Sequence, residues 1–273
     1  MAKYKRHFVL MSYDVDANNN AKPTIIAKLL NETANLHMRD RRPTYYELFF
    51  KGLSFIAVRM AMEIKEQLHP YDEVDVYTWT AEGKGATFFR CYSIERDGVE
   101  LVRAYSEWTV ANLNTGKLCH RDEIDFSNYE VDELHELDVP IKFHFPSDIE
   151  FEKCGEHIVE YTDTDMNGHM NNTIYQNVIW SHVPDVENKK LTGISMRYMA
   201  EAPQCSTVEI YRAKVCADAD GKGGADVDTD DMGARTSTSE SYYFKTVVNG
   251  NVNTAALVRC AKTERYTDVD KRI

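Results

Sequence analysis

The chain of 273 residues lacks any apolar run close to the roughly 18 residues that a membrane-spanning helix needs. Its opening stretch, MAKYKRHFVLMSYDVD, has neither the apolar core nor the small-residue cleavage site of a secretion signal. The six cysteines lie far apart and form no CxxC pair, which argues against a zinc site and suits reduced thiols. These absences predict a cytoplasmic protein with no membrane span, metal or cofactor.

Positive charge is also scarce. The chain has 32 Lys and Arg residues against 44 Asp and Glu residues, a net charge of −12, and nothing forms a concentrated basic stripe. Nucleic acid is therefore not an expected partner. With 43% hydrophobic and 28% charged residues the composition is that of an ordinary globular protein, long enough for one large domain or two modest ones.

The chain contains an internal repeat. When residues 14–25 are aligned without a gap on residues 163–174, the same Asp, Asp, Asn, Thr and Ile recur in the same order. One chemically distinct position stands out, because His169 of the second copy corresponds to Asn20 of the first. Asp, Asn and Gly are ordinary turn residues, so a plain turn is the simplest interpretation of each copy.

The surroundings of the two copies repeat as well. Each copy follows a short strand-like segment and precedes a helical pattern, over 24–37 in the first half and 173–183 in the second, where Asn171 or Asn172 suits the N-cap. Strand-like runs then follow, at 54–66, 75–83, 86–95 and 100–113, and at 193–201, 207–216, 241–248 and 253–264. Asp97-Gly98 and Asn249-Gly250 are strong hairpin signals. The sequence therefore predicts an α+β unit that occurs twice.

Composition suggests where the two units divide. Residues 126–150 are acidic and interrupted by Pro140 and Pro146, which is typical of a linker. We expect an N-terminal unit at 1–125 and a C-terminal unit at 151–273. Within the second unit, the low-complexity stretch 217–240 predicts a flexible insertion, because its composition cannot bury a core and its Asp spacing does not fit a calcium loop.

The second copy, with the pattern Asp163-x-Asp165-x-Asn167-x-His169-x-Asn171-Asn172-x-x-Tyr175, resembles the signature of the acyl-acyl-carrier-protein thioesterases of plants and bacteria. Matches in the flanking strands extend the resemblance over nearly the whole chain except the insertion. The resemblance implies a tandem hotdog fold, in which a long helix is wrapped by an antiparallel sheet, twice. It also implies hydrolysis of fatty acyl-acyl-carrier-protein to free fatty acid, which ends fatty-acid synthesis.

The same resemblance implies a catalytic set of Asp165, Asn167, His169 and Glu201. In an extended segment the first three would project to one side, just before a helix whose free N–H groups suit an oxyanion. As a hypothesis, Glu201 or Asp165 acts as base or holds water, His169 polarises the thioester or shuttles the proton, and Asn167 orients the water. Backbone N–H groups near 168–170 would bind the oxyanion, whereas Asp163 is expected only to shape the turn.

One position departs from the family. Plant members have a cysteine directly after the downstream Glu, whereas this chain has Ala202, with Cys205 three residues further on. The departure favours direct attack by water over a cysteine nucleophile. Because only the second copy has the histidine, one active site per chain is expected, with the first hotdog housing much of the acyl chain and setting its length preference.

The expected partner is an acyl carrier protein that bears a fatty acyl chain, and a homodimer is left open. Because this chain is acidic like its carrier, docking would rely on local basic patches. Candidates are Arg39, Arg41 and Arg42, and Lys189–Lys190, whereas Arg59 is expected to make a structural salt bridge. Two alternatives remain open: an acyl-coenzyme A thioesterase on the same fold, and a non-catalytic acyl-binding hotdog.

Overall fold

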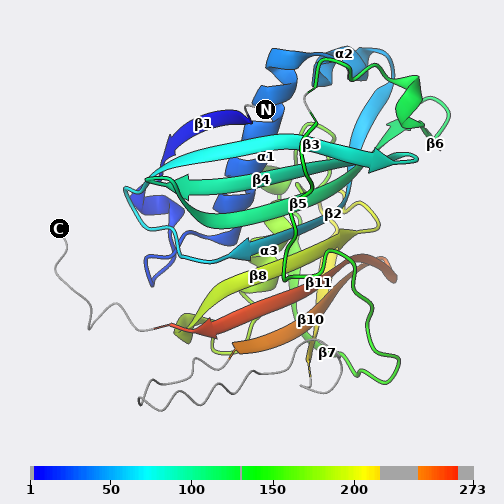
Figure 1. Ribbon diagram of the computed structural model, residues 1–273. Coiled ribbons are helices and arrows are strands. Elements are labelled where there is room, and N and C mark those ends of the chain that lie inside the picture. The colour runs from blue at the N-terminus through cyan, green and yellow to red at the C-terminus, as the bar shows by residue number, and fades with distance from the viewer. Residues whose placement is uncertain (1–2, 130, 216–238, 264–273) are drawn as a thin grey trace.

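The computed structural model describes residues 3–129, 131–215 and 239–263 and consists of one long, curved antiparallel sheet with helices on its inner face (Figure 1). The predicted insertion at 217–240 lies almost wholly outside these residues. None of the helices in the described parts is both long enough and apolar enough to cross a membrane.

The elements of the first half comprise two helices and six strands: β1 Tyr4–Val9, α1 Pro23–Arg41, α2 Tyr45–Phe50, β2 Leu53–Ile64, β3 Glu73–Lys84, β4 Thr87–Arg96, β5 Val99–Asn112 and β6 Lys117–Leu118. The second half contains β7 Glu152–Ile158, α3 Ile174–Trp180, β8 Lys189–Tyr198, β9 Thr207–Lys214, β10 Ser239–Val248 and β11 Asn251–Lys262. Short 3-10 turns precede the two repeated loops, η1 at Ser12–Asp14 and η3 at Tyr161–Asp163.

The strand order shows that the repeat is built into the fold. The path through the sheet is β1-β3-β4-β5-β2-β8-β11-β10-β9-β7, so the second half reverses the order of the first and the two meet at β2 and β8. That central antiparallel pair aligns Met60 with Met196 and Met62 with Ile194. This symmetric arrangement confirms the predicted α+β fold with two hotdogs, joined edge to edge in one continuous sheet.

Equivalent bulges interrupt the two central strands. The register between β2 and β5 shifts at Val58, and the register between β8 and β11 shifts at Thr192, the corresponding position. A bulge reverses the inward and outward alternation of side chains. As a result Ile56 is 42% exposed, although simple alternation from Met60 would bury it.

Both predicted hairpins are confirmed. Asp97 and Gly98 connect β4 to β5 with φ values of 52° and 77°, and Asn249 and Gly250 connect β10 to β11 with φ values of 50° and 79°. Two successive residues in the left-handed region match the twist of the flanking strands, which is why Asn-Gly and Asp-Gly are favoured there.

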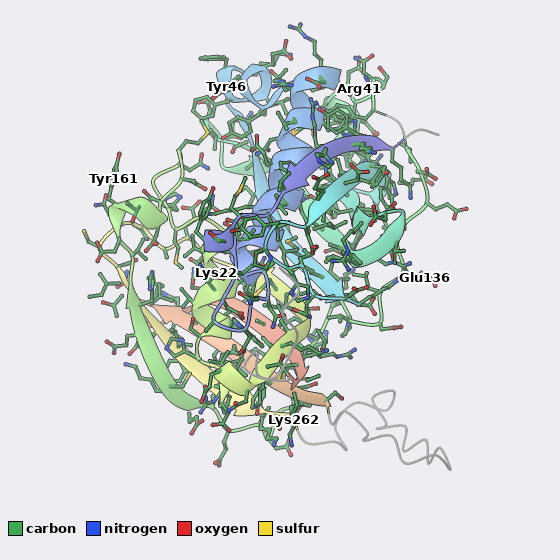
Figure 2. All side chains as sticks on the ribbon, turned by 90° about the vertical axis from the view of Figure 1, so that its left-hand side faces the viewer. Lys22, Arg41, Tyr46, Glu136, Tyr161 and Lys262 are labelled. Carbon is green, nitrogen blue, oxygen red and sulfur yellow. The ribbon has the colours of Figure 1, made fainter. Side chains whose placement is uncertain are left out.

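The two helices differ in length. Helix α1 has 19 residues, longer than the predicted 24–37 segment, and rises from Lys22 toward Arg41 with α2 beside its upper end (Figure 2). Helix α3 has only 7 residues and ends well before the predicted position 183. Ser181 explains the early end, because its hydroxyl donates to the carbonyl of Asn177, and Pro184 follows shortly afterwards.

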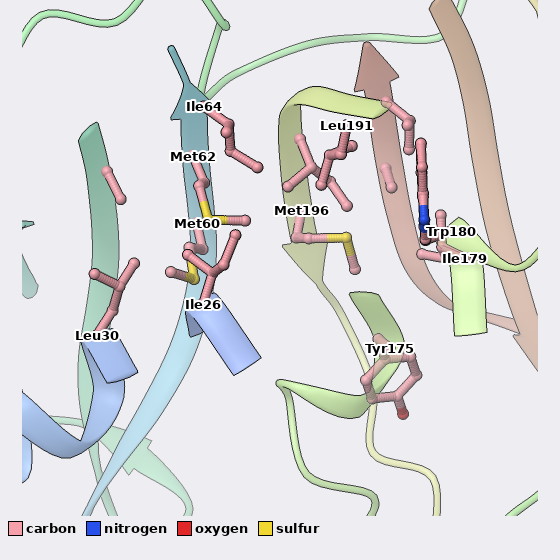
Figure 3. Packing of buried hydrophobic residues seen from close by; sticks show 14 of the residues in the cluster. Ile26, Leu30, Met60, Met62, Ile64, Tyr175, Ile179, Trp180, Leu191 and Met196 are labelled. Carbon is pink, nitrogen blue, oxygen red and sulfur yellow. The ribbon is translucent and has the colours of Figure 1, made fainter. Parts of the chain in front are cut away.

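One hydrophobic core runs through both halves. Ile26 of α1 lies beside Met62 of β2, with Leu30 one helical turn further along, and across the central strand pair Met196 of β8 points toward Ile179 of α3 (Figure 3). All five side chains are almost completely buried. The sheet and its helices therefore form a single packed unit, and the predicted division at 125 and 151 stays a prediction.

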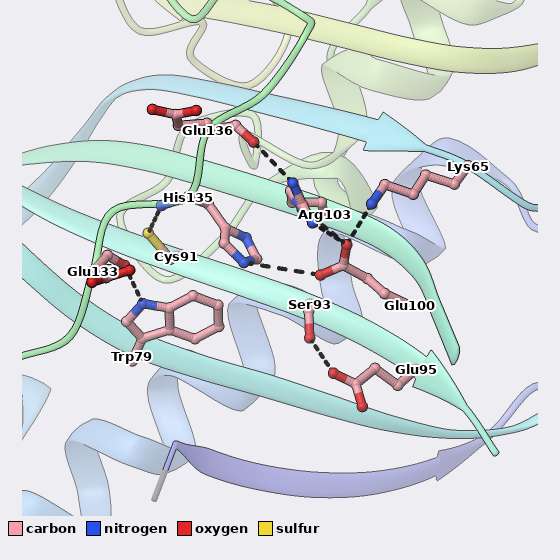
Figure 4. A network of polar contacts seen from close by, with 10 residues as sticks. All are labelled: Lys65, Trp79, Cys91, Ser93, Glu95, Glu100, Arg103, Glu133, His135 and Glu136. Carbon is pink, nitrogen blue, oxygen red and sulfur yellow. Dashed lines mark hydrogen bonds and ion pairs between the residues drawn. The ribbon is translucent and has the colours of Figure 1, made fainter. Parts of the chain in front are cut away.

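The segment predicted as a linker packs against the outer face of the sheet. The Trp79 indole donates to the carbonyl of Glu133 at 2.8 Å, and the His135 ring lies edge-on to Trp79 (Figure 4). Further along, Ser195 of β8 donates to the carbonyl of Pro140. The segment thus spans both halves and covers apolar surface that the sheet would otherwise expose.

Two expectations about basic residues have clear outcomes. Arg59 makes the expected structural salt bridge, with its Nη1 2.6 Å from Oε2 of the buried Glu107. Lys189 was a candidate for carrier docking, and this prediction is wrong. Its side chain is buried, with Nζ 2.9 Å from the Glu240 carboxylate, so it is not available to a partner.

Candidate active site

The loop that contains His169 is a tight turn. The backbone N–H of Asp165 donates to the carbonyl of His169 at 3.0 Å, and that of Gly168 donates back to the carbonyl of Asp165 at 2.9 Å. Gly168 has a φ of 78°, which costs glycine little. The predicted extended segment is therefore wrong, because turn hydrogen bonds close the loop on itself.

The first copy forms the same turn. The N–H of Asp16 donates to the carbonyl of Asn20 at 2.8 Å, and the N–H of Asn19 donates to the carbonyl of Asp16 at 3.0 Å. In both copies the aspartate side chain also accepts a hydrogen bond at 2.8 Å from the backbone two residues later, Asn18 in one and Asn167 in the other. The repeat seen in the sequence is thus a repeat of three-dimensional structure.

The side chains of His169 and Glu201 form a pair. Nε2 of His169 lies 3.1 Å from Oε2 of Glu201, and the two side chains are 31% and 67% exposed. Glu201 comes from the segment after β8. The N–H of Met170 holds that segment against the loop by donating to the carbonyl of Ala202 at 2.9 Å. Two regions far apart in the sequence therefore bring the imidazole and the carboxylate together.

This contact selects a tautomer of His169. A carboxylate is an acceptor, so the imidazole must donate to it through Nε2–H. In the neutral ring Nδ1 then carries a lone pair and can accept a proton. In this arrangement the imidazole of His169 can act as a base, and the carboxylate of Glu201 holds the ring in its orientation.

Of the other residues in the loop, Asp165 and Asp163 hold the turn together, whereas the side chain of Asn167 does not. Oδ1 of Asp165 is occupied by the backbone of its own loop, which indicates a role in shaping the turn. Asp163 is a turn former as expected, since its Oδ2 accepts from the N–H of Glu160 and lies 2.8 Å from Nε2 of His157. The side chain of Asn167 is exposed and takes no part in these turn bonds.

Most of the backbone N–H groups near 168–170 that were expected to bind the oxyanion are already hydrogen-bonded within the protein. The N–H of Gly168 and that of Met170 already donate to carbonyls, and the N–H of Thr173, the N-cap residue of α3, donates to Oδ1 of Asn171. The predicted N-cap at Asn171 or Asn172 is therefore wrong, because the helix begins after Thr173, and Asn171 instead shapes the turn before it. Within the described residues, the N–H of His169 makes no hydrogen bond and is the donor that stays available.

A single cavity of about 2090 Å³ connects this loop with the first half of the molecule. Its walls include all four predicted site residues, Asp165, Asn167, His169 and Glu201. The opposite walls come from the first half and are rich in aromatic side chains: Tyr45, Phe55, Phe88, Trp108 and Phe126.

No cysteine of the described chain lines the cavity, and Cys205 lies on an exposed turn. Nor do the described residues include a group of three or more His, Cys, Asp or Glu arranged to hold a metal ion.

Sequence reasoning missed two relevant residues. Tyr45 lies on α2, a helix of 6 residues that is too short to show a period, although the pattern Thr44-x-x-Glu47 is a capping box that signals its start. The other is Gln67, the counterpart of Glu201 in the first half. The contact from Ala21 to the carbonyl of Leu68 repeats the one from Met170 to Ala202 and identifies it.

Comparison with known proteins agrees with this architecture. The models of the acyl-ACP thioesterase N-terminal domain and C-terminal domain match residues 1–125 and 147–258. The chain belongs to the acyl-ACP thioesterase family. The palmitoyl-acyl carrier protein thioesterase of Cuphea hookeriana is 25% identical over 233 residues, 77% of this chain and 54% of that protein. The oleoyl-acyl carrier protein thioesterase 2 of Arabidopsis thaliana is 26% identical over 235 residues, 76% of this chain and 61% of that protein. The chain thus spans a little over half the length of these relatives.

Solved structures of the family share the fold. An acyl-ACP thioesterase from Bacteroides thetaiotaomicron superposes with a TM-score of 0.76 at 21% identity, covering 94% of this chain and 96% of that one. The 12:0-ACP thioesterase from Umbellularia californica superposes with a TM-score of 0.71 at 17% identity, covering 95% and 94%. Both structures therefore extend over the two halves of the described sheet.

Proposed function

We propose that this chain hydrolyses the thioester of a fatty acyl chain carried on acyl carrier protein and releases the free fatty acid. The observation that carries the proposal is the pair of His169 and Glu201, 3.1 Å apart, at the wall of a large cavity with aromatic walls. The pair supplies a base, and the cavity has the size and character that an acyl chain requires. Membership of the acyl-ACP thioesterase family supports the same reaction.

The chemistry follows from the tautomer of His169. Nδ1 removes a proton from a water molecule, whose oxygen attacks the carbonyl carbon of the thioester, while Glu201 stabilises the imidazolium that forms. The N–H of His169 and the side chain of Asn167 stabilise the developing oxyanion. The carbon–sulfur bond then breaks, the proton passes from His169 to the leaving thiolate, and the fatty acid departs. No cysteine nucleophile is needed.

The acyl chain would extend from His169 into the first half, along Phe55, Phe88 and Phe126. Phe88 packs edge-to-face on both other rings and Phe55 is tilted against Phe126, with centroids 5.1 to 6.0 Å apart. In this proposal the second half carries the chemistry and the first half sets the chain length. We place the reaction in the cytoplasm, and the five described cysteines, which are free thiols, are compatible with that location.

Substrates of graded length test the proposal. Purified protein would be given saturated acyl chains of increasing length, each attached either to acyl carrier protein or to coenzyme A, and free thiol release would be followed. We expect hydrolysis of the carrier-linked series with a clear optimum of chain length. Absence of hydrolysis for every carrier-linked chain would refute the proposal, and equal rates on coenzyme A would favour the acyl-coenzyme A alternative.

A further inference from the structure

A helix of the first half reaches the catalytic loop of the second. The hydroxyl of Tyr45, at the start of α2, lies 3.5 Å from Oδ1 of Asn167. Both side chains line the same cavity. Among the described residues this is the one hydrogen bond that the Asn167 side chain makes. At 3.5 Å the bond is long, as catalytic hydrogen bonds often are before a substrate binds.

Tyr45 is held by a firmly anchored helix. A capping box fixes the start of α2, where Glu47 and Thr44 exchange hydrogen bonds of 3.1 and 2.7 Å, and Arg42 lies 2.9 Å from the Glu47 carboxylate. Leu48 buries the helix against the core of the first half and is only 2% exposed. The Tyr45 ring also stacks on Phe49, four residues later, at an interplanar angle of 18°. The position of the phenol is thus set before any contact with the loop.

A hydrogen bond from Tyr45 to Oδ1 would determine which end of the Asn167 amide faces a substrate. A primary amide has an acceptor oxygen at one end and two N–H donors at the other. When the Tyr45 hydroxyl donates to Oδ1, the Nδ2 donors are left for a thioester oxygen. They then act together with the N–H of His169, which is also available. Without the hydroxyl the amide can turn over, and its oxygen would repel the developing negative charge.

We propose that Tyr45 is a positioning residue for Asn167, through which the acyl-binding half orients an oxyanion donor of the catalytic half. The inference rests on the proposed function for its kinetic consequence but not for the contact itself. Tyr45→Phe removes the hydroxyl and keeps the ring that stacks on Phe49, so the fold is preserved. Tyr46→Phe is the matched control, because the Tyr46 hydroxyl makes no hydrogen bond within the described residues.

The kinetic test is a double-mutant cycle on acyl-carrier-protein hydrolysis. We expect Tyr45→Phe to lower kcat about three- to tenfold with little change in KM, since one hydrogen bond to a reacting-site amide is lost. Tyr46→Phe should keep the wild-type kcat. In an Asn167→Ala background, removal of the Tyr45 hydroxyl should have no further effect. An unchanged kcat in Tyr45→Phe, or the same loss in both backgrounds, would overturn the proposal.

A second readout does not depend on activity. The side-chain amide signals of Asn167 in a ¹H–¹⁵N spectrum can be assigned by their disappearance in Asn167→Asp. Tyr45→Phe should shift these signals, and Tyr46→Phe should leave them in place. If the spectra respond in this way but no carrier-linked substrate is hydrolysed, the proposed function fails and the contact stands. If the Asn167 amide signals do not shift in Tyr45→Phe, the positioning role of Tyr45 is wrong, whatever activity the variant has.

Discussion

The two copies of the loop have nearly the same backbone and opposite surroundings. In the second copy, His169 and Glu201 are partly exposed and face the cavity. In the first copy, the corresponding Asn20 and Gln67 are 6% and 9% exposed. The same turn therefore presents accessible side chains at the cavity in the second half and buried side chains in the first half.

What covers the first loop comes from the second half. Gln67 donates to the carbonyl of Leu191 at 2.9 Å, and Asn18 donates to that of Glu187 at 2.9 Å. In the other direction the first half contributes α2 and the aromatic walls of the cavity, and it leaves the second loop open. The turn is thus a scaffold in both halves, and two side chains with access to the cavity distinguish the second copy as the candidate site.

The largest effect should come from making the second loop resemble the first at one residue. His169→Asn introduces the side chain found at position 20 and removes the base. We expect kcat to fall by about a thousandfold or more, because base and nucleophile activation are both lost. The melting temperature should stay near the wild-type value, since the turn hydrogen bonds involve the backbone. A variant that keeps a tenth or more of the wild-type kcat would contradict this role.

The next effect concerns the orientation of the imidazole. Glu201→Gln introduces the side chain found at position 67 and replaces the carboxylate by a neutral amide. We expect a loss in kcat of about a hundredfold, smaller than that for His169→Asn, because the base is retained but its tautomer and charge are no longer stabilised. The comparison is made by steady-state hydrolysis of one carrier-linked substrate. A loss larger than that of His169→Asn would instead make Glu201 the base.

The matched aspartates separate scaffold from chemistry. Asp165→Ala and Asp16→Ala each remove the side-chain acceptor of one turn, so each should lower the free energy of unfolding by roughly 1 to 3 kcal/mol. Only Asp165→Ala should also impair hydrolysis, by about tenfold, through displacement of His169. Urea unfolding measures the loss of stability in both variants, and steady-state kinetics measures the loss of hydrolysis. Equal kinetic losses would mean that the two loops do not differ in role.

The smallest effect is on the pH dependence of stability. Burial, with the nearby Arg90 guanidinium second, lowers the pKa of His37 in the first half from 6.5 to about 3. Burial likewise lowers the pKa of His135 to about 4. Between these values and 6.5 the unfolded chain binds more protons than the folded one, so stability is complete above pH 6.5 and is lost as the pH falls. Each histidine contributes at most about 1.4 kcal/mol per pH unit.

His37→Asn tests this linkage. Its amide oxygen can replace Nδ1 as the acceptor for Arg90, which now lies 3.0 Å away, and it does not titrate. Urea unfolding between pH 5 and 7.5 should show a shallower slope for the variant than for the wild type. Identical slopes would mean that His37 is not kept neutral by the fold.

Much of the fold was predictable because the signals were periodic or repeated. The duplicated loop, the alternating strands and the Asp97-Gly98 hairpin each correspond to a local rule that tertiary structure does not override. The bulge at Val58 was not predictable, since it leaves no compositional mark and reverses the side of Ile56. The early end of α3 likewise depends on Ser181, whose side-chain bond competes with the helix.

For the site, the residue types were predictable but the geometry was not. The sequence predicted His169 and Glu201 as site residues, and their pairing requires the contact between the loop and the segment after β8. It could not show that Asp165 is occupied by its own turn, because alternation predicts an extended segment there. Tyr45 was missed since its partner Asn167 lies in the other half of the chain, and no local pattern connects them.

In the proposed mechanism His169 and Glu201 act as one pair, and a double variant tests this most directly. His169→Asn combined with Glu201→Gln gives the second loop both of the side chains found in the first. Single-turnover hydrolysis of a carrier-linked acyl chain would be compared among the wild type, the two single variants and the double variant. We expect the double variant to be no slower than His169→Asn alone, with the fold intact. Independent, multiplicative losses would show that the two residues do not work as a pair and would contradict the central claim.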